Sequence, residues 1–341
     1  MSFHRIVGSD MRERRSDVAG AFARRAAVLA AVGFFALSAA ADHGPGTSGG
    51  GLSTQSGETM RPGAVVLSLR SDFTQYEDLS DDDLQTRTLK PGGADGHFDA
   101  LDWSLLETIG VAWGLAEDVE VGASLGFYDG EGLREGHLDA GVYDLHKHGS
   151  VKGVTDPWLT GKVRVYRGPA GRFAVLGGLK PPLGTHTLRG EGERLDPAVQ
   201  PGSGAFDAMA GVACSEWLTE RTTLDASFQY TVRGRHAGMK IGNRAELGTA
   251  VAYRFSEAVD AVPRWSAFLE ATIRNLQRNN EGGEDEEHSG GTAVFIAPGV
   301  RTSLAGGVSV SLAIPVSVLQ RVHEDQQETR YKVSIGVTKT F

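Results

Sequence analysis

Residues 331–341, YKVSIGVTKTF, alternate between apolar and polar side chains up to the end of the chain. Successive side chains of a β-strand point to opposite faces, so one face of this strand is apolar: Tyr331, Val333, Ile335 and Val337. Lys339 interrupts the apolar column, and aromatic Phe341 closes the strand. A half-apolar last strand that ends on an aromatic residue is typical of a membrane-spanning β-barrel, because every second residue of its wall faces lipid.

The N-terminal residues predict export. Five arginines between Arg12 and Arg25 precede an apolar run, Ala26–Ala41, that closes on small side chains with an A-x-A pattern at Ala39 and Ala41. The run is shorter than the about 20 residues of a spanning helix, so we interpret residues 1–41 as a signal peptide. Residues 42–62, rich in Gly, Ser and Thr, predict a flexible segment that either hangs in the periplasm or folds into the barrel mouth.

Composition agrees with an exported all-β chain. The 341 residues have a mean hydropathy of −0.21, 46 glycines and 12 prolines. Cys214 is the only cysteine, which excludes an internal disulfide. The net charge of −9 argues against a nucleic-acid partner.

Residues 63–341 predict an antiparallel up-and-down barrel of about twelve strands. The segments with alternating character lie near residues 63–76, 99–113, 118–128, 155–167, 172–182, 205–217, 222–234, 243–255, 264–275, 292–303, 307–319 and 329–341. Long, charged connections alternate with tight turns, which is the asymmetry of a barrel in the outer membrane with both ends in the periplasm. Glu107 falls on the predicted lipid face and suggests a bulge or a misplaced strand end.

Aromatic residues occur at the predicted strand ends, where rings settle at the lipid headgroups. One predicted girdle, on the periplasmic side, contains Trp113, Trp217, Phe255, Trp265 and Phe341. The opposite girdle would draw on Phe73, Tyr76, Trp103, Phe127 and Tyr230. On the strands themselves, residues 308–318 place Val308, Val310, Leu312, Ile314, Val316 and Val318 toward lipid.

The same alternation directs charged side chains inward. The candidates for lining the lumen are Arg70, Asp72, Lys162, Arg164, Lys180, Asp207, Asp225, Arg233, Arg254, Glu270 and Arg274. Charges inside a low-dielectric wall either pair with one another or face water. The sequence therefore leaves two alternatives, a lumen braced shut by ion pairs and a wet path for a small solute.

Several segments, taken in order, resemble the outer-membrane transporters of the meta-pathway phenol-degradation family. They are GVTDPWLTGKVRVY (153–166), AVLGGLKPPLGT (174–185), residues 195–215, TTLDASFQYTVRG (222–234), FIAPGVRTSL (295–304), SVSLAIPVSV (309–318) and the C-terminal strand. The resemblance implies a barrel that admits aromatic or other hydrophobic compounds. It also implies that Lys180, Pro181, Gly184, Gly202, Gly204, Phe206 and Asp207 flank the loop between the fifth and sixth strands.

Histidines give the only other chemical signal. His137, His146 and His148 share one predicted loop with carboxylates, a ligand set that suits zinc, nickel or copper. Their spacing matches no closed site, so we predict no metal centre there. We also predict no enzyme and no cofactor, because no strand histidine lies beside an outward serine.

We therefore expect an outer-membrane channel for passive uptake of small solutes, including aromatic ones. The alternative is a non-conducting structural or divalent-metal-binding barrel. The expected partners are outer-membrane lipid and lipopolysaccharide, the solute, and the barrel-insertion machinery, which would recognise Phe341.

Overall fold

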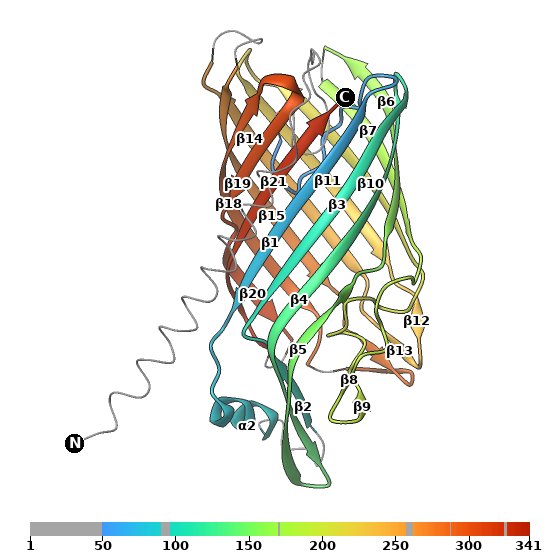
Figure 1. The fold of residues 1–341 in the computed structure, drawn as a ribbon, viewed down its shortest axis with the longest axis vertical. Coiled ribbons are helices and arrows are strands. Elements are labelled where there is room, and N and C mark those ends of the chain that lie inside the picture. Colours follow the sequence, from blue (N-terminus) through green and yellow to red (C-terminus); the bar gives the residue numbers. More distant parts are fainter. Residues whose placement is uncertain (1–49, 90–95, 170, 257–261, 287, 324–325) are drawn as a thin grey trace, which may run out of the picture. The chain divides into compact units, whose positions relative to one another are not determined.

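A computed structural model describes residues 50–89, 96–169, 171–256, 262–286, 288–323 and 326–341. Within these residues the chain forms a closed antiparallel barrel of twelve strands (Figure 1). Its wall contains β1 (Val65–Tyr76), β3 (Trp103–Ala116), β4 (Val119–Asp139), β5 (Val142–Val154) continued by β6 (Trp158–Gly168), β7 (Gly171–Lys180), β10 (Asp207–Trp217), β11 (Thr222–Val232), β14 (Arg244–Arg254), β15 (Arg264–Leu276), β18 (Gly291–Leu304), β19 (Val308–Ala313) continued by β20 (Val316–Val322), and β21 (Thr329–Thr340).

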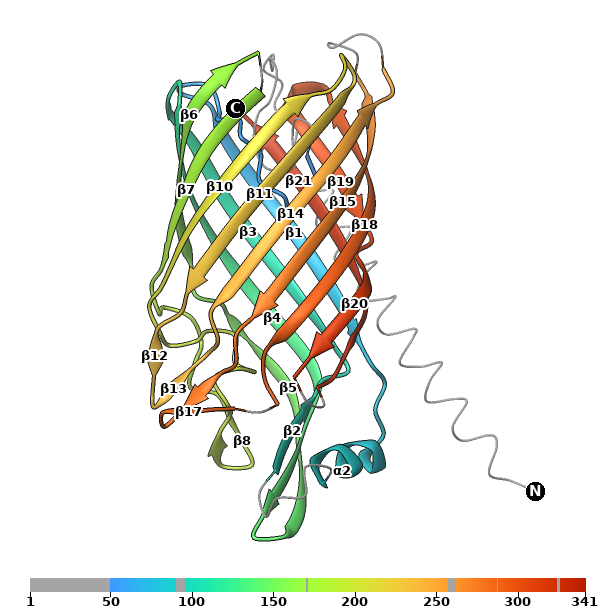
Figure 2. The same ribbon diagram turned by 180° about the vertical axis from the view of Figure 1, so that it is seen from behind.

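The sheet closes where the first strand meets the last. β1 pairs with β21 over its whole length, from Val66 opposite Thr340 to Tyr76 opposite Thr329. All twelve strands run antiparallel to their neighbours, and Figure 2 shows the far wall from β10 to β18. The expected barrel is confirmed, because this closure leaves no free sheet edge.

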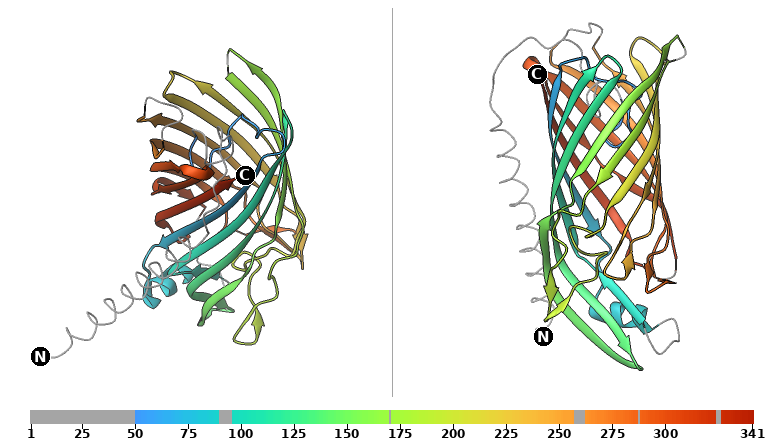
Figure 3. Two further views of the ribbon diagram at one scale, coloured as in Figure 1. Left: turned by 45° about the horizontal axis from the view of Figure 1, so that its top comes forward. Right: turned by 90° about the vertical axis from the view of Figure 1, so that its right-hand side faces the viewer.

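The two ends of the barrel differ in their connections. At the end that carries Phe341, which we call the turn end, the connections are short, as between β3 and β4 or between β18 and β19 (Figure 3). At the other end, the loop end, the connections contain the helix α2 (Asp81–Leu89) and the short strands β2 (Gly96–Ala100), β8 (Arg189–Gly190), β9 (Glu193–Arg194), β12 (Arg235–His236), β13 (Met239–Lys240), β16 (Asn280–Glu281) and β17 (Glu284–Asp285). This asymmetry is the one that the sequence predicts.

Prolines interrupt two of the wall strands. The strand expected over residues 307–319 is broken between β19 and β20, at Pro315, and β5 ends shortly before Pro157. Proline has no N–H to donate to a ladder, so each break is a local loss of pairing. The wall continues past both, because the carbonyl of Pro315 still accepts from the Lys332 N–H at 2.9 Å.

The outer face of the barrel is apolar. Large hydrophobic side chains point outward on every strand, among them Ile109, Leu159, Leu269 and Val318, each more than half exposed. On β11 and β19 the residues between the outward ones, such as Asp225 and Ser311, are buried. Continuous apolar surface of this kind is stable only against lipid, so the barrel spans a bilayer.

Aromatic residues border this belt. Trp113, Trp217, Phe255, Trp265 and Phe341 are exposed at the turn end. Towards the loop end, Phe73 packs against Trp103 and Tyr331 with ring centroids 6.0 and 6.4 Å apart. Tyr76 differs from the expectation of a lipid-facing ring, because it lies on the inward side of the alternation and its hydroxyl is 3.2 Å from that of Ser104.

Part of the predicted loop region is regular structure. β4 and β5 run on beyond the barrel as a hairpin, β2 pairs with β4 from Gly96 to Ala100, and α2 packs its buried Leu84 against Phe98 and Leu145. Both faces of this extension carry polar residues, so its strands lack the apolar alternation that identifies the strands of the barrel wall. The sequence does contain a helix-capping signal, Ser80 followed three residues later by Asp83. The Asp83 N–H donates to the Ser80 hydroxyl at 3.1 Å, and the Ser80 N–H donates to the Asp83 carboxylate at 2.9 Å.

Two other expectations concern the strand that contains Glu107 and the N-terminal segment. β3 keeps one register past Glu107, which lies opposite Ser71 and Phe127, so the bulge suggested there is absent. The predicted signal peptide, residues 1–41, lies outside the described residues. No helix in the described part of the chain is long and apolar enough to cross a membrane.

The apolar belt predicts that a charged substitution destabilises the barrel more near the middle of the bilayer than at its edge. Leu269 is outward-facing and four residues from the girdle residue Trp265, so it lies near the middle of the bilayer. We expect Leu269→Arg to lower the free energy of unfolding by about 2–4 kcal/mol, and Leu218→Arg in the β10–β11 turn by at most about 1 kcal/mol. Denaturant unfolding in lipid vesicles measures both, and equal costs would contradict the assigned belt.

Candidate functional site

Charged side chains on the inner face of the wall are mostly arranged as ion pairs. Lys162 and Glu120, on neighbouring strands, lie 3.1 Å apart and are almost fully buried. Arg274 and Glu246 are paired at 2.8 Å across β14 and β15, and Arg70 and Asp72 at 2.7 Å within β1. Pairing of this kind offsets the cost of removing charge from bulk water.

A second group of ions fastens the long loop between β7 and β10. The Asp156 carboxylate, only 1% exposed, accepts from Lys180 Nζ at 2.9 Å and from the backbone N–H groups of Gly184 and Ser203, both at 2.8 Å. Lys180 also pairs with Asp207 at 2.8 Å. The two ends of the loop are therefore tied to one buried carboxylate. Sequence reasoning proposed Lys180 and Asp207 but missed Asp156, whose signal was its place before Pro157 between two strands.

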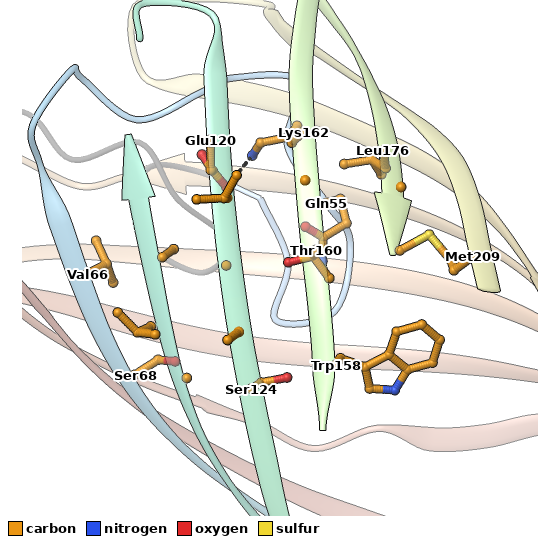
Figure 4. Close-up of a pocket in the computed structure, with 18 of the residues that line it drawn as sticks. Gln55, Val66, Ser68, Glu120, Ser124, Trp158, Thr160, Lys162, Leu176 and Met209 are labelled. Carbon is orange, nitrogen blue, oxygen red and sulfur yellow. Dashed lines mark ion pairs between the residues drawn. The ribbon is translucent and has the colours of Figure 1, made fainter. Parts of the chain in front are cut away.

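Residues 50–62, which we call the inner segment, run inside the barrel. Thr54, Thr59 and Met60 are no more than 3% exposed. The segment occupies the turn half of the lumen before the chain enters β1, and Figure 4 shows Gln55 beside the inner wall. The sequence predicts that residues 42–62 either hang in the periplasm or fold into the barrel mouth; residues 50–62 lie inside the barrel, and residues 42–49 lie outside the described residues.

Glu270 is the main anchor of the inner segment. Its carboxylate accepts hydrogen bonds from the backbone N–H groups of Leu52, Ser53 and Thr54, at 3.1, 3.0 and 2.5 Å, and from the Thr54 hydroxyl at 2.6 Å. A Cβ at Gly51 would lie 2.4 Å from the Glu270 carboxyl carbon, so a side chain there would displace the Glu270 carboxylate from its present position. Each N–H would otherwise be buried without a partner.

Further charges hold the segment on either side of this anchor. Arg301 donates to the carbonyls of Gly50 and Gly51 at 3.0 and 3.2 Å. Nearer the turn end, Glu58 pairs with Arg164 at 3.0 Å and with Arg172 at 3.2 Å.

Two more acidic residues of the wall also contact the segment. The Met60 N–H donates to Glu120 at 3.1 Å, and the Ser215 hydroxyl, bonded to the Gly57 N–H at 2.8 Å, donates to Asp225. Several wall charges are therefore partners of the segment as well as of one another.

A cavity of about 350 Å³ remains beside the inner segment. Its lining combines the Lys162–Glu120 pair with hydroxyl and amide groups and with the apolar side chains of Trp158, Leu176 and Met209 (Figure 4). Inward-facing glycines, Gly110 and Gly122, leave space at the inner wall of the cavity. The space suits a small molecule with both polar and apolar surface.

Cations predominate on the inner face towards the loop end. The set that we call the basic cluster contains Arg70, Arg233, Arg244, Arg274 and Lys332, which act electrostatically on one another and on Asp72 and Glu246. Arg244 also lines the cavity. The remaining candidate, Arg254, lies near the turn end and donates to the Glu220 carbonyl at 2.8 Å.

The predicted histidines lie on the extension of β2, β4 and β5 rather than in an irregular loop. The rings of His146 and His148 stack with centroids 5.9 Å apart, and His137 lies edge-on to His97 at 6.4 Å. The Glu135 carboxylate contacts two histidines: its oxygens lie 3.0 Å from His97 Nε2 and 2.9 Å from His148 Nε2. Sequence reasoning missed the part of His97 and Glu135 in this group, because β2 and its pairing with β4 were not expected.

Residues 110–321 match the model of a protein family described as "Putative MetA-pathway of phenol degradation". No curated protein matches the chain.

Among solved structures, an outer membrane channel from Pseudomonas putida F1 superposes with a TM-score of 0.60 and 11% identity, covering 83% of this chain and 97% of that one. The porins KdgM and NanC give TM-scores of 0.41 and 0.42 at 6% and 9% identity, covering 72% and 80% of this chain and 98% of each porin. The superposition on the Pseudomonas putida channel shows that the two proteins share a fold. The TM-scores of the two porins are too low to support a structural argument. With the apolar belt and the closed sheet, the prediction of an outer-membrane barrel is confirmed.

The anchoring of the inner segment can be tested through Glu270. Glu270→Ala removes the acceptor of three N–H groups inside the barrel, of which the buried one at Thr54 costs about 1–3 kcal/mol when left unpaired, so the segment should leave its site. We expect hydrogen exchange of residues 52–54 to accelerate by at least about tenfold in the folded barrel. Glu220→Ala, at an exposed turn, is the control; unchanged protection in Glu270→Ala would show that other contacts hold the segment.

Proposed function

The chain belongs to the MetA-pathway phenol-degradation family, and from this premise we propose that it is an outer-membrane channel for passive passage of small solutes. The observation that carries the proposal is the polar lumen of a closed barrel, with an internal cavity of about 350 Å³ beside ionic groups. Passive passage needs no cofactor, because the driving force is the solute gradient.

We extend the proposal to aromatic and other hydrophobic solutes. The family description names phenol degradation, and the cavity wall sets Trp158 and Met209 opposite polar groups. An aromatic ring with a hydroxyl group would find both kinds of surface there.

The lining residues would be those whose side chains face the lumen from the wall: Arg70, Asp72, Lys162, Arg164, Lys180, Asp207, Asp225, Arg233, Arg254, Glu270 and Arg274. In this proposal the basic cluster sets charge preference and the inner segment sets the width. Because the inner segment occupies part of the turn half of the lumen, we expect a continuous path to require at least part of it to move. Glu270 and Glu58 would then control how readily it does so.

Conductance in planar bilayers tests the channel. The wild-type barrel should give discrete steps, and Glu270→Ala should increase the open fraction by releasing the inner segment. Arg233→Ala removes one cation of the basic cluster, so the anion-to-cation permeability ratio should fall. Lys240→Ala, on a short strand beyond the barrel wall, should leave the ratio unchanged.

The competing function is that of a non-conducting structural barrel. The buried ion pairs that brace the inner wall, such as Lys162–Glu120, favour it. A bilayer that stays silent with wild type and with Glu270→Ala would support this function and contradict the channel.

Phe341 would serve recognition during assembly, and lipopolysaccharide would contact the loop end. The Phe341 N–H donates to the Val65 carbonyl at 2.9 Å, while its ring is 65% exposed. Deletion of Phe341 should therefore reduce the amount of inserted barrel in cells several-fold while the refolded protein keeps its heat-modifiable migration on gels. Normal insertion of the shortened chain would exclude this role of the residue.

A further inference from the structure

One face of the extension built from β2, β4 and β5 gathers side chains of the kinds that ligate metals. The pairing places His97 opposite His137 and Asp99 opposite Glu135, and it places Glu135 opposite His146. Directly opposed residues share a face in an antiparallel pair. This face, which we call the histidine face, contains His97, Asp99, Glu135, His137, Asp144, His146 and His148. The opposite face carries Phe98 and Leu145 and is covered by α2.

The centre of the histidine face is compact. His97 Nε2 lies 3.0 Å from one oxygen of Glu135 and 3.5 Å from Asp99 Oδ1, and the three ligand atoms are all within 4.8 Å of one another. His148 Nε2 lies 2.9 Å from the second oxygen of Glu135. Ligand atoms around a tetrahedral zinc ion with bonds of about 2.0–2.1 Å are separated by about 3.3 Å. The separations of His97 Nε2 from Glu135 and Asp99, 3.0 and 3.5 Å, are close to this value.

We propose that His97, Asp99 and Glu135, with His148 beside them, bind one divalent transition-metal ion of the zinc type. The clustered donors are the His97 imidazole and two carboxylates, and the His148 imidazole lies on the second oxygen of Glu135. A mixed set of nitrogen and oxygen donors suits zinc and its neighbours better than calcium or magnesium. The ligands come from three adjacent strands, so the ladder hydrogen bonds hold their backbones in place.

The surroundings of the centre favour a cation. The β8–β9 hairpin covers the histidine face, and its Glu191 accepts His146 at 2.7 Å. The His148 side chain is 6% exposed, and its Nδ1 is buried with no hydrogen-bond partner in the described structure. Gly190 lies directly over that ring, where a Cβ would be 2.0 Å from Nδ1. Asp196 adds a further negative charge nearby.

Burial opposes charge on the His97 ring, but Glu135 and Asp99 outweigh it and raise the pKa of His97 to about 9. Burial raises the pKa of Asp99 to about 7, while hydrogen bonds from His97 and His148 lower the pKa of Glu135 despite its partial burial. Because His97 must be neutral to ligate, an entering metal ion would displace its proton.

Zinc titration of the purified full chain in detergent, after removal of metals with a chelator, tests the site. We expect one tightly bound Zn²⁺ per chain and proton release, measured by calorimetry in two buffers of different ionisation enthalpy. His97→Gln and Glu135→Gln should each weaken binding by at least about tenfold. X-ray absorption at the zinc edge should show only nitrogen and oxygen neighbours, since Cys214 lies on the barrel wall.

The matched control is His323→Gln, an exposed histidine on another loop, which should bind as wild type does. Heat-modifiable migration on gels confirms that each variant keeps a folded barrel, and His148→Gln provides a third variant should His97→Gln fail to fold. Wild-type affinity in His97→Gln and Glu135→Gln, or an equal loss in His323→Gln, would overturn the site. The titration does not depend on conductance, so its result is separate from that of the proposed channel.

Discussion

The pairing of β1 with β21 is the constraint on which the rest of the structure depends. Within a bilayer no water satisfies a backbone N–H or C=O, so every strand needs two neighbours and the sheet must close. Ten consecutive register pairs between the first and last strands, and an eleventh after a shift at Tyr76, achieve this closure. Once the wall is closed, successive side chains of each strand face either the lipid or the lumen, and those that face the lipid must be apolar. The breaks at Pro157 and Pro315 are tolerated because pairing resumes immediately on both sides.

Closure also creates an interior with its own requirements. Charges that alternation directs inward are too crowded to be hydrated individually, so they are satisfied by one another and by the inner segment. Glu270 illustrates this, since its carboxylate accepts from residues 52–54, more than 200 positions away in sequence. The inner segment in turn has few apolar residues, and it is ordered by hydrogen bonds and ion pairs with the wall.

Beyond the bilayer the rule of one apolar face no longer applies. The extension of β4 and β5 has water or other loops on both sides, so its strands carry polar residues on both faces and resemble loops in sequence. The residues that make the histidine face were visible individually, but β2 was not expected, and its pairing with β4 is what brings His97 to Glu135. In the same way, Asp156 looked like part of a turn, whereas in the fold it ties Lys180, Gly184 and Ser203 together.

The sequence by itself determined the barrel, its strand number, the faces of its strands and the difference between its two ends. These features follow from a period of two and from lipid on one side, which are local and repeat along the chain. Only the tertiary structure decided which inward charges pair, that residues 50–62 lie in the lumen, and that the ligand-type side chains of His97, Asp99 and Glu135 meet at one point. Those outcomes depend on contacts between segments far apart in sequence, and no local pattern of side chains encodes which distant partner a buried charge will find.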